Sequence, residues 1–160
     1  MLRLLVTLLS LSAPLASADA PIDLVRVIKS EHKLQLVSSG IVQREFHIAL
    51  GGNPNGHKSQ EGDGKTPEGI YTLDYKKSDS AFTKAFHISY PNAADVAAAK
   101  THGNLPGGQI MIHGQKNGLG WLAPVIQHFN WTNGCIALKN EDIDTLWSSV
   151  KEGTTIEIRP

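Results

Sequence analysis

Short hydrophobic runs separated by polar or glycine positions follow one another along most of the chain, and they predict β-strands. The first three runs are rich in Val, Ile and Leu and are divided by Glu31-His32 and by Ser39-Gly40, which is typical of an antiparallel meander. Four later runs have the same character. We therefore predict strands at residues 24–29, 34–38, 41–50, 70–75, 86–90, 110–113 and 154–158.

Two segments have helical rather than strand character. Asn92 is a suitable N-cap for an alanine-rich segment at 93–100, and Gly103 is placed to end it. Residues 140–150 begin with acidic side chains, carry apolar residues at helical spacing and precede Gly153. The pattern predicts a mainly β domain of mixed strands with two short helices and without internal repeats.

The amino-terminal residues resemble a secretory signal. Arg3 supplies the positive end, residues 4–11 are apolar, and Ala16-Ser17-Ala18 is a small-residue cleavage site. The apolar run is far shorter than the roughly 20 residues of a membrane span. We expect residues 1–18 to be a signal peptide, with Ala20 as the alternative cleavage point. Residues 19–160 then form one domain, exported to the periplasm or cell wall and without a membrane span.

Charge and cysteine content narrow the function classes. The 160 residues hold 15 Lys+Arg and 15 Asp+Glu, so the chain lacks the net positive charge typical of nucleic-acid binding. A single cysteine, Cys135, excludes an intramolecular disulfide and any metal site built from several cysteines of one chain. An unpaired cysteine in an exported protein suggests a reactive thiol. A buried, inert Cys135 is the alternative.

The glycine-rich segment 51–69 contains Gly64-Lys65-Thr66, which suggests a phosphate-binding loop. That motif requires a glycine five positions before Gly64, where Ser59 stands, and a helix after it. An alternating strand follows instead, so nucleotide binding is not predicted. A connection this long in a small domain is more often functional than decorative.

Cys135 has one preferred basic partner among the seven histidines. A thiol becomes nucleophilic as a thiolate, which requires a nearby imidazole or backbone amides directed at the sulfur. His113 ends an apolar run and precedes Gly114, so we expect it at the rim of a sheet. His128 does not end a predicted strand and is not followed by a glycine. The amides of Gly134 and Cys135 are the nearest oxyanion donors. A zinc site is disfavoured because no two histidines show helical ligand spacing with an acid between them.

Four motifs, in this order, resemble the YkuD-type catalytic domain of L,D-transpeptidases, in the exported, murein-processing subgroup. The matching segments are Glu61-Gly62-Asp63-Gly64-Lys65-Thr66-Pro67-Glu68-Gly69-Ile70-Tyr71, Ile88-Ser89-Tyr90-Pro91-Asn92, Ile112-His113-Gly114 and Thr132-Asn133-Gly134-Cys135-Ile136-Ala137-Leu138.

The resemblance implies a β-sandwich in which Cys135 is the nucleophile and His113 is the general base and acid. It implies that the Gly114 carbonyl orients the His113 ring. Gly134 supports the reacting centre, and Thr132, Asn133 and Trp131 are predicted to contact substrate. The family signature often has Arg two residues after the cysteine, where this chain has Ala137.

The implied reaction is acyl transfer from a peptidoglycan stem peptide through a thioester, with no cofactor and no metal. The acceptor amine is expected to come from another stem peptide or from a wall-attached lipoprotein. Hydrolysis, by a carboxypeptidase or by an amidase that releases a protein or peptide, is the alternative. A lesser alternative is a non-catalytic peptidoglycan-binding domain with a buried cysteine.

The interval between His113 and Cys135 is long for the family, so residues 117–130 are expected to form a lid. Trp121, Phe129 and Trp131 lie in or next to this segment. Aromatic residues in such a position line a substrate groove or cover the edge of the core, and the sequence leaves both interpretations open.

Overall fold

The structure, a computed structural model, describes residues 20–160. The predicted signal peptide, residues 1–18, lies outside the described residues. Within residues 20–160, no helix has both the length and the apolar character needed to cross a membrane.

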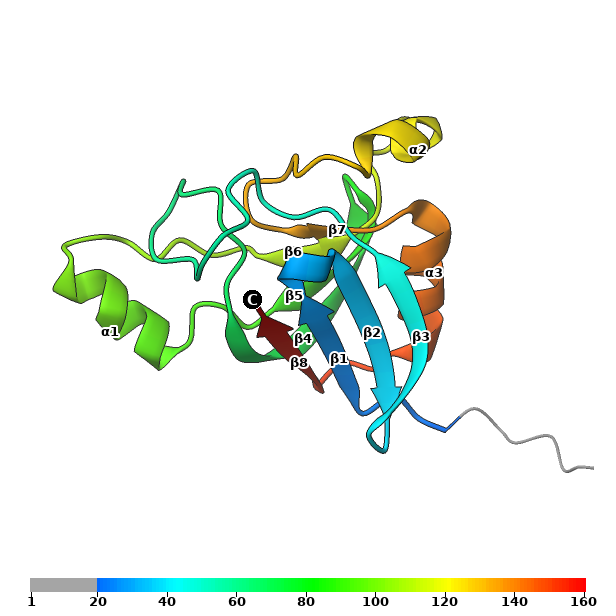
Figure 1. Cartoon of the computed structure of the whole chain (residues 1–160), viewed down its shortest axis with the longest axis horizontal. Helices are drawn as coiled ribbons and strands as arrows, with labels where there is room; N and C mark the ends of the chain where they lie inside the picture. The colour runs from blue at the N-terminus through cyan, green and yellow to red at the C-terminus, as the bar shows by residue number, and fades with distance from the viewer. Residues whose placement is uncertain (1–19) are drawn as a thin grey trace, which may run out of the picture.

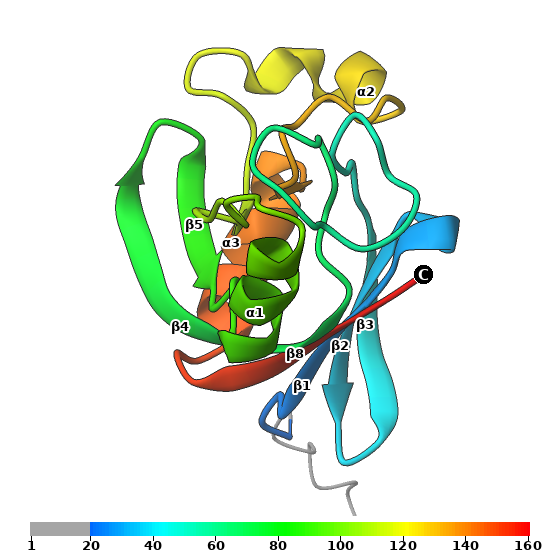
Figure 2. The ribbon, with the colours of Figure 1, turned by 90° about the vertical axis from the view of Figure 1, so that its left-hand side faces the viewer.

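The strands form one mixed sheet that curls strongly (Figures 1 and 2). Its strands are β1 (Leu24–Ile28), β2 (Lys33–Ser38), β3 (Ile41–His47), β4 (Gly69–Ser80), β5 (Thr83–Ile88), β6 (Met111–His113), β7 (Ile136–Ala137) and β8 (Thr154–Arg159). Across the sheet their order is β3-β2-β1-β8-β4-β5-β6-β7. The β1–β8 and β6–β7 pairs are parallel and the other neighbours are antiparallel. The mainly β fold class is therefore confirmed, as is the antiparallel β1-β2-β3 meander.

Three α-helices accompany the sheet: α1 (Ala93–Thr101), α2 (Ala123–Ile126) and α3 (Asn140–Ser149). Two 3-10 turns, η1 (Lys29–Glu31) and η2 (Gly120–Leu122), complete the secondary structure. Asn92 caps α1 as expected, since its side chain accepts hydrogen bonds from the Ala94 and Asp95 amides. The sequence predicted two short helices, which correspond to α1 and α3. It did not predict α2, because a single helical turn is too short to show a periodic pattern.

The core lies on the concave side of the curled sheet, where α3 is seated (Figure 2). Alternate residues of the strands point inward, and Ile143 and Leu146 of α3 are fully buried beside them. Trp147 packs its ring edge-on against Phe86 of β5, with ring centroids 5.5 Å apart. At its other end, α3 begins close to the end of β6, because Asn140 packs against Gly114, the residue after His113.

The hairpin of β4 and β5 is longer than predicted. Residues 76–79 lie outside the two strands predicted at 70–75 and 86–90, but they continue β4, in which Lys76 and Lys77 pair with β5. Solvent on one side explains why the hydrophobic pattern fades there. The turn of this hairpin carries Phe82 to the site described below.

Candidate active site

Cys135 and His113 line one cleft of about 480 Å³. The cleft also brings together the predicted substrate-contacting residues, and it adds side chains that the sequence did not indicate. Gly114 and Gly134 lie directly beside the lining residues in the chain. The lining consists of Ser80, Phe82, Gln109, Met111, His113, Trp131, Thr132, Asn133 and Cys135.

The parallel pairing of β6 with β7 brings Cys135 and His113, the two predicted catalytic residues, to the same sheet edge. Ile112 is opposite Ile136, and the Leu138 amide donates to the His113 carbonyl at 2.8 Å. Cys135 immediately precedes β7, while His113 is the last residue of β6. Two residues that are distant in sequence therefore face the same cleft.

His113 is buried, with 5% of its surface exposed. Its Nδ1 lies 2.7 Å from the Gly114 carbonyl oxygen, which can only accept, so Nδ1 carries the proton of the neutral ring. Nε2 is then the basic nitrogen. The Phe82 ring packs against the imidazole with centroids 4.6 Å apart. Burial lowers the pKa of His113, although the Gly114 hydrogen bond acts in the opposite direction.

The thiol of Cys135 is also held in its neutral form. Burial raises its pKa, while the Met111 backbone and the Lys58 ammonium act in the opposite direction. Its Sγ lies 3.6 Å from the Gln109 carbonyl oxygen. At neutral pH the cleft therefore holds a neutral thiol and a neutral imidazole.

A tight turn places Cys135 in the cleft. The Thr132 hydroxyl donates to the Cys135 carbonyl at 2.7 Å and accepts from the Gly134 amide at 3.2 Å. Gly134 has φ +123°, a region that favours glycine. A Cβ at this position would lie 2.5 Å from the Lys65 carbonyl oxygen. Glycine is therefore required both for the turn and for the close approach of the loop behind it.

Gly114 is required by close packing rather than by its dihedral angles. A Cβ there would lie 2.9 Å from Asn140 Oδ1 and 3.0 Å from Ile143 Cγ2 of α3. Asn140 Oδ1 also accepts from the Gln115 amide at 2.9 Å and from the Thr83 hydroxyl at 3.1 Å. The start of α3 thus holds the segment after His113, a role for Asn140 that the sequence did not reveal.

Loop 51–69 packs behind the turn that carries Cys135. The Gly52 amide donates to the Thr132 carbonyl at 2.9 Å. Within the loop, Asp63 receives Lys58 Nζ at 2.8 Å and three backbone amides. Burial alone would raise the pKa of Asp63, but these donors lower it to about 2. The loop is built around a buried ion pair and not around a phosphate site.

A second buried lysine anchors the other end of the loop. Lys29 Nζ donates to the carbonyls of Gly56 and Thr66, at 2.7 and 3.0 Å, and pairs with Glu68 at 2.8 Å. Both lysines are at most 4% exposed. Isolated lysines in a polar sequence read as surface residues, so no signal in the sequence indicated these anchors.

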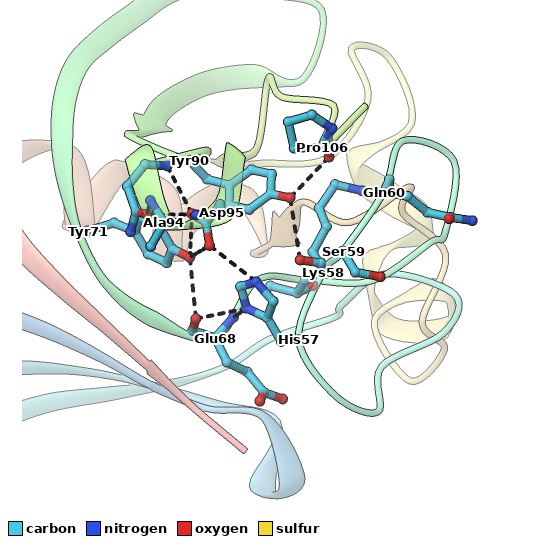
Figure 3. A network of polar contacts seen from close by, with 12 residues as sticks. His57, Lys58, Ser59, Gln60, Glu68, Tyr71, Tyr90, Ala94, Asp95 and Pro106 are labelled. Carbon is cyan, nitrogen blue, oxygen red and sulfur yellow. Dashed lines mark hydrogen bonds and ion pairs between the residues drawn. The ribbon is translucent and has the colours of Figure 1, made fainter. Parts of the chain in front are cut away.

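A polar network joins the loop to α1 (Figure 3). His57 Nε2 lies 3.2 Å from Asp95 Oδ1, and the Tyr71 hydroxyl donates to the same carboxylate. The Tyr90 hydroxyl donates to the carbonyls of Lys58 and Pro106. His57 is therefore a partly buried residue that joins the loop to α1.

Two buried glutamines fasten the expected lid to the site. Gln127, just after α2, donates to the Ala137 carbonyl at 2.7 Å. Gln115 donates to the Gln127 side chain at 2.9 Å and to the Leu138 carbonyl at 2.6 Å. The lid at 117–130 is thus tied to the strand that follows Cys135. Ala137 itself is fully buried.

The remaining histidines are not in the cleft. His128, the weaker candidate for the base, lies near His47, with ring centroids 6.1 Å apart. His87 pairs with Asp74 at 2.7 Å on another strand pair. Across residues 20–160, no three His, Cys, Asp or Glu side chains are grouped so that they could hold a metal ion.

Residues 22–158 match the family model of the L,D-transpeptidase catalytic domain, YkuD. The chain belongs to the YkuD family. YafK of Escherichia coli K12, described provisionally as an L,D-transpeptidase, is 34% identical over 97 residues, which are 59% of this chain and 32% of YafK.

Solved structures share the YkuD-like fold. The helical cell shape determining protein Pgp2 from Campylobacter jejuni is 27% identical, with a TM-score of 0.65 over 88% of this chain and 48% of that one. An L,D-transpeptidase from Xylanimonas cellulosilytica matches at a TM-score of 0.57 over 92% of this chain and 64% of that one. At 15% identity it supports the fold alone. The chain thus spans a third to a half of the length of YafK and Pgp2.

Proposed function

We propose that this protein is a cysteine-dependent acyltransferase that acts on peptidoglycan stem peptides in the periplasm or cell wall. The observation that carries the proposal is the shared cleft of Cys135 and His113, in which the Gly114 carbonyl holds Nδ1 and leaves Nε2 as the basic nitrogen. Membership in the YkuD family supports the same chemistry and the same substrate class.

The first half of the reaction forms a thioester. His113 Nε2 takes the proton of the Cys135 thiol as the sulfur attacks the carbonyl carbon of the amide bond that follows a diaminopimelate-type residue. The Gly134 amide is already engaged by Thr132, so we assign the oxyanion to the Cys135 amide. The C–N bond then breaks, and the leaving amine receives the proton from His113.

The second half consumes the thioester. An acceptor amine attacks the acyl carbon and gives its proton to His113, which returns it to the departing sulfur of Cys135. An amine of another stem peptide yields a crosslink, and an amine of a wall lipoprotein yields an attached protein. Water in place of the amine yields hydrolysis. No step requires a metal or a cofactor.

Product analysis tests the proposal. Purified protein is incubated with a muropeptide that bears a tetrapeptide stem, and the products are identified by mass spectrometry as crosslinked, trimmed or released. Cys135→Ala should abolish turnover. If Cys135→Ala turns over substrate as fast as the wild type, Cys135 is not the nucleophile.

The base assignment is tested with a matched pair of histidine variants. His113→Ala should lower kcat/KM by roughly two orders of magnitude or more, the scale of a lost general acid and base. His102→Ala, at the exposed end of α1, should retain wild-type activity. Equal losses in both variants would show that the effect is not specific to the cleft.

Thiol labelling separates catalysis from passive binding. A non-catalytic peptidoglycan-binding domain predicts a Cys135 that does not react with iodoacetamide at neutral pH, whereas the acyltransferase predicts labelling that depends on His113. An inert thiol would therefore overturn the enzymatic proposal in both its transfer and its hydrolytic form.

A further inference from the structure

The turn between β4 and β5 brings Phe82 to the catalytic cleft and holds one residue in an unusual backbone conformation. Thr83, the first residue of β5, has φ +68°. A β-branched residue rarely adopts this left-handed region, because its side chain collides with the backbone. Such a conformation persists only where surrounding contacts compensate for its cost, and it is found most often at functional sites. A strained residue beside the cleft therefore points to a role for the turn that contains it.

The turn is bonded to the segment that directly follows His113. The Gly114 amide donates to the Phe82 carbonyl at 3.1 Å. The Thr83 hydroxyl lies 3.0 Å from the Gln115 carbonyl and donates to it. The Gly114 carbonyl also orients the imidazole of His113. The same short segment therefore holds both the catalytic histidine and the turn that carries Phe82.

Asn117 fastens the turn with three further hydrogen bonds. Its backbone amide donates to the Ala81 carbonyl at 2.9 Å, and its side-chain nitrogen donates to the Ser80 carbonyl at 3.0 Å. Its Oδ1 accepts from the Thr83 amide at 2.8 Å. One asparagine therefore binds three residues of the turn, and these bonds compensate for the left-handed backbone of Thr83.

The ring that the turn carries covers the imidazole of His113. The ring centroids of Phe82 and His113 are 4.6 Å apart, with an angle of 40° between the ring planes. Trp131 packs edge-on against the same imidazole, with centroids 5.8 Å apart. His113 is only 5% exposed although it lines the cleft. The Phe82 ring is therefore one of two aromatic covers that keep water from the imidazole.

Burial, and not a neighbouring charge, accounts for the lowered pKa of His113. Its causes are burial, which lowers the pKa, and the Gly114 hydrogen bond, which raises it. Within residues 20–160, no charged side chain on the surrounding elements contributes to the shift. The titratable residues on those elements are Cys135 in the cleft, Asp79, Lys84 and His87 beside the turn, Lys116 and His128 between β6 and β7, Lys139, Glu141, Asp142 and Asp144 at the start of α3, and Lys58 and Lys65 in loop 51–69.

We propose that the β4–β5 turn, residues 80–83, is a positioning element for His113, in which Asn117 holds the strained backbone and the Phe82 ring keeps water from the imidazole, so that Nε2 stays unprotonated at neutral pH. Unprotonated Nε2 is the form that takes the thiol proton, so this inference rests on the proposed function. An aromatic ring also attracts a cation, which favours the protonated imidazole. Because the pKa of His113 is lowered, exclusion of water outweighs this attraction.

NMR titration of the imidazole nitrogens tests the role of the ring. The spectrum of His113→Ala identifies the His113 signals among those of the seven histidines. Phe82→Ala admits water, so the titration midpoint of His113 should rise towards 6.5, the ordinary value for histidine. Phe82→Leu keeps an apolar cover and removes only the attraction of the ring, so its midpoint should not exceed that of the wild type. A midpoint that stays unchanged or falls in Phe82→Ala would overturn the proposal.

Asn117→Ala tests the part played by the strained turn. It removes the two side-chain bonds to Ser80 and Thr83, so the turn should relax and the His113 midpoint should rise as in Phe82→Ala. Tyr75→Ala is the control, because Tyr75 stacks on a histidine outside the cleft, His87, with centroids 4.6 Å apart, and it should leave the His113 midpoint unchanged. A turn that serves stability alone would lower the melting temperature of Asn117→Ala without moving the midpoint, and that result contradicts the proposal.

The profile of kcat/KM against pH separates this inference from the proposed function. If both are right, the midpoint on the acid side of the profile should rise in Phe82→Ala by as much as the NMR midpoint of His113. If the NMR midpoints move as expected but the wild type shows no turnover that depends on Cys135, the role of the turn stands and the catalytic proposal falls. If the wild type is active and neither midpoint moves in Phe82→Ala, the acyltransferase stands and the role of the turn falls.

Discussion

Asp63→Asn should destabilise the protein because it removes the charge on which loop 51–69 is built. The wild-type carboxylate is 8% exposed, pairs with Lys58 at 2.8 Å and accepts three backbone amides. Its pKa falls from 3.8 to about 2, which corresponds to about 2.5 kcal/mol in favour of the charged form in the folded state.

The variant also leaves the Lys58 ammonium, 3% exposed, without its counter-charge. We expect a loss of about 2 to 4 kcal/mol in the free energy of unfolding and a melting temperature lower by roughly 5 to 15 °C. Urea titration at pH 7 measures the free energy of unfolding, and calorimetry measures the melting temperature. Asp144→Asn is the control, because the Asp144–Lys84 pair is largely exposed and should contribute less than about 1 kcal/mol.

The lowered pKa of Asp63 also predicts how its contribution to stability changes with pH. A carboxylate with a lowered pKa stabilises the fold above its unfolded value of 3.8, and that contribution is lost as the pH falls towards 2. The difference between wild type and Asp63→Asn should therefore be largest above pH 5 and should shrink below pH 4. A difference under about 0.5 kcal/mol at pH 7, or one independent of pH, would refute the reasoning.

Two further predictions concern the reacting centre. In the profile of kcat/KM against pH, the loss of activity on the acid side should have its midpoint below pH 6.5. The reason is that the pKa of His113 is lowered and that the reaction requires its neutral form. The loss of activity on the alkaline side should have its midpoint above pH 9, because the pKa of Cys135 is raised. A midpoint on the acid side at pH 7 or higher contradicts this assignment. Gly134→Ala should lower activity at least about 100-fold, since its Cβ would collide with the Lys65 carbonyl. Gly62→Ala, at φ +77° in open space, should cost only backbone strain, and equal effects would argue against the steric reason.

Most strands, and the placing of Cys135 and His113 in one cleft, could be predicted because both leave local signals. Alternating apolar residues indicated most strands, and the one cysteine together with a histidine at a strand end pointed to Cys135 and His113. The two-residue β7 was missed because it is too short for a pattern. Its pairing with β6, which brings the reactive residues to one edge, depends on contacts between distant segments.

The supporting residues left no local signal. Lys29 and Lys58 resemble surface lysines until the loop folds over them, and Phe82 lies in a hairpin turn far from Cys135 in sequence. Asn140 was indicated only as the start of a helix, whereas its side chain also holds the segment after His113. Such roles arise from tertiary packing, which the periodicity of a sequence does not encode.

Intact-protein mass spectrometry of the wild type, mixed rapidly with a tetrapeptide-bearing muropeptide, tests whether Cys135 carries the acyl group. We expect a transient adduct whose mass is that of the substrate less the terminal amino acid that leaves as the amine. Proteolysis should locate it on Cys135, and hydroxylamine should remove it as expected for a thioester. Product formation without any such adduct, or an adduct that persists in Cys135→Ala, would contradict the account.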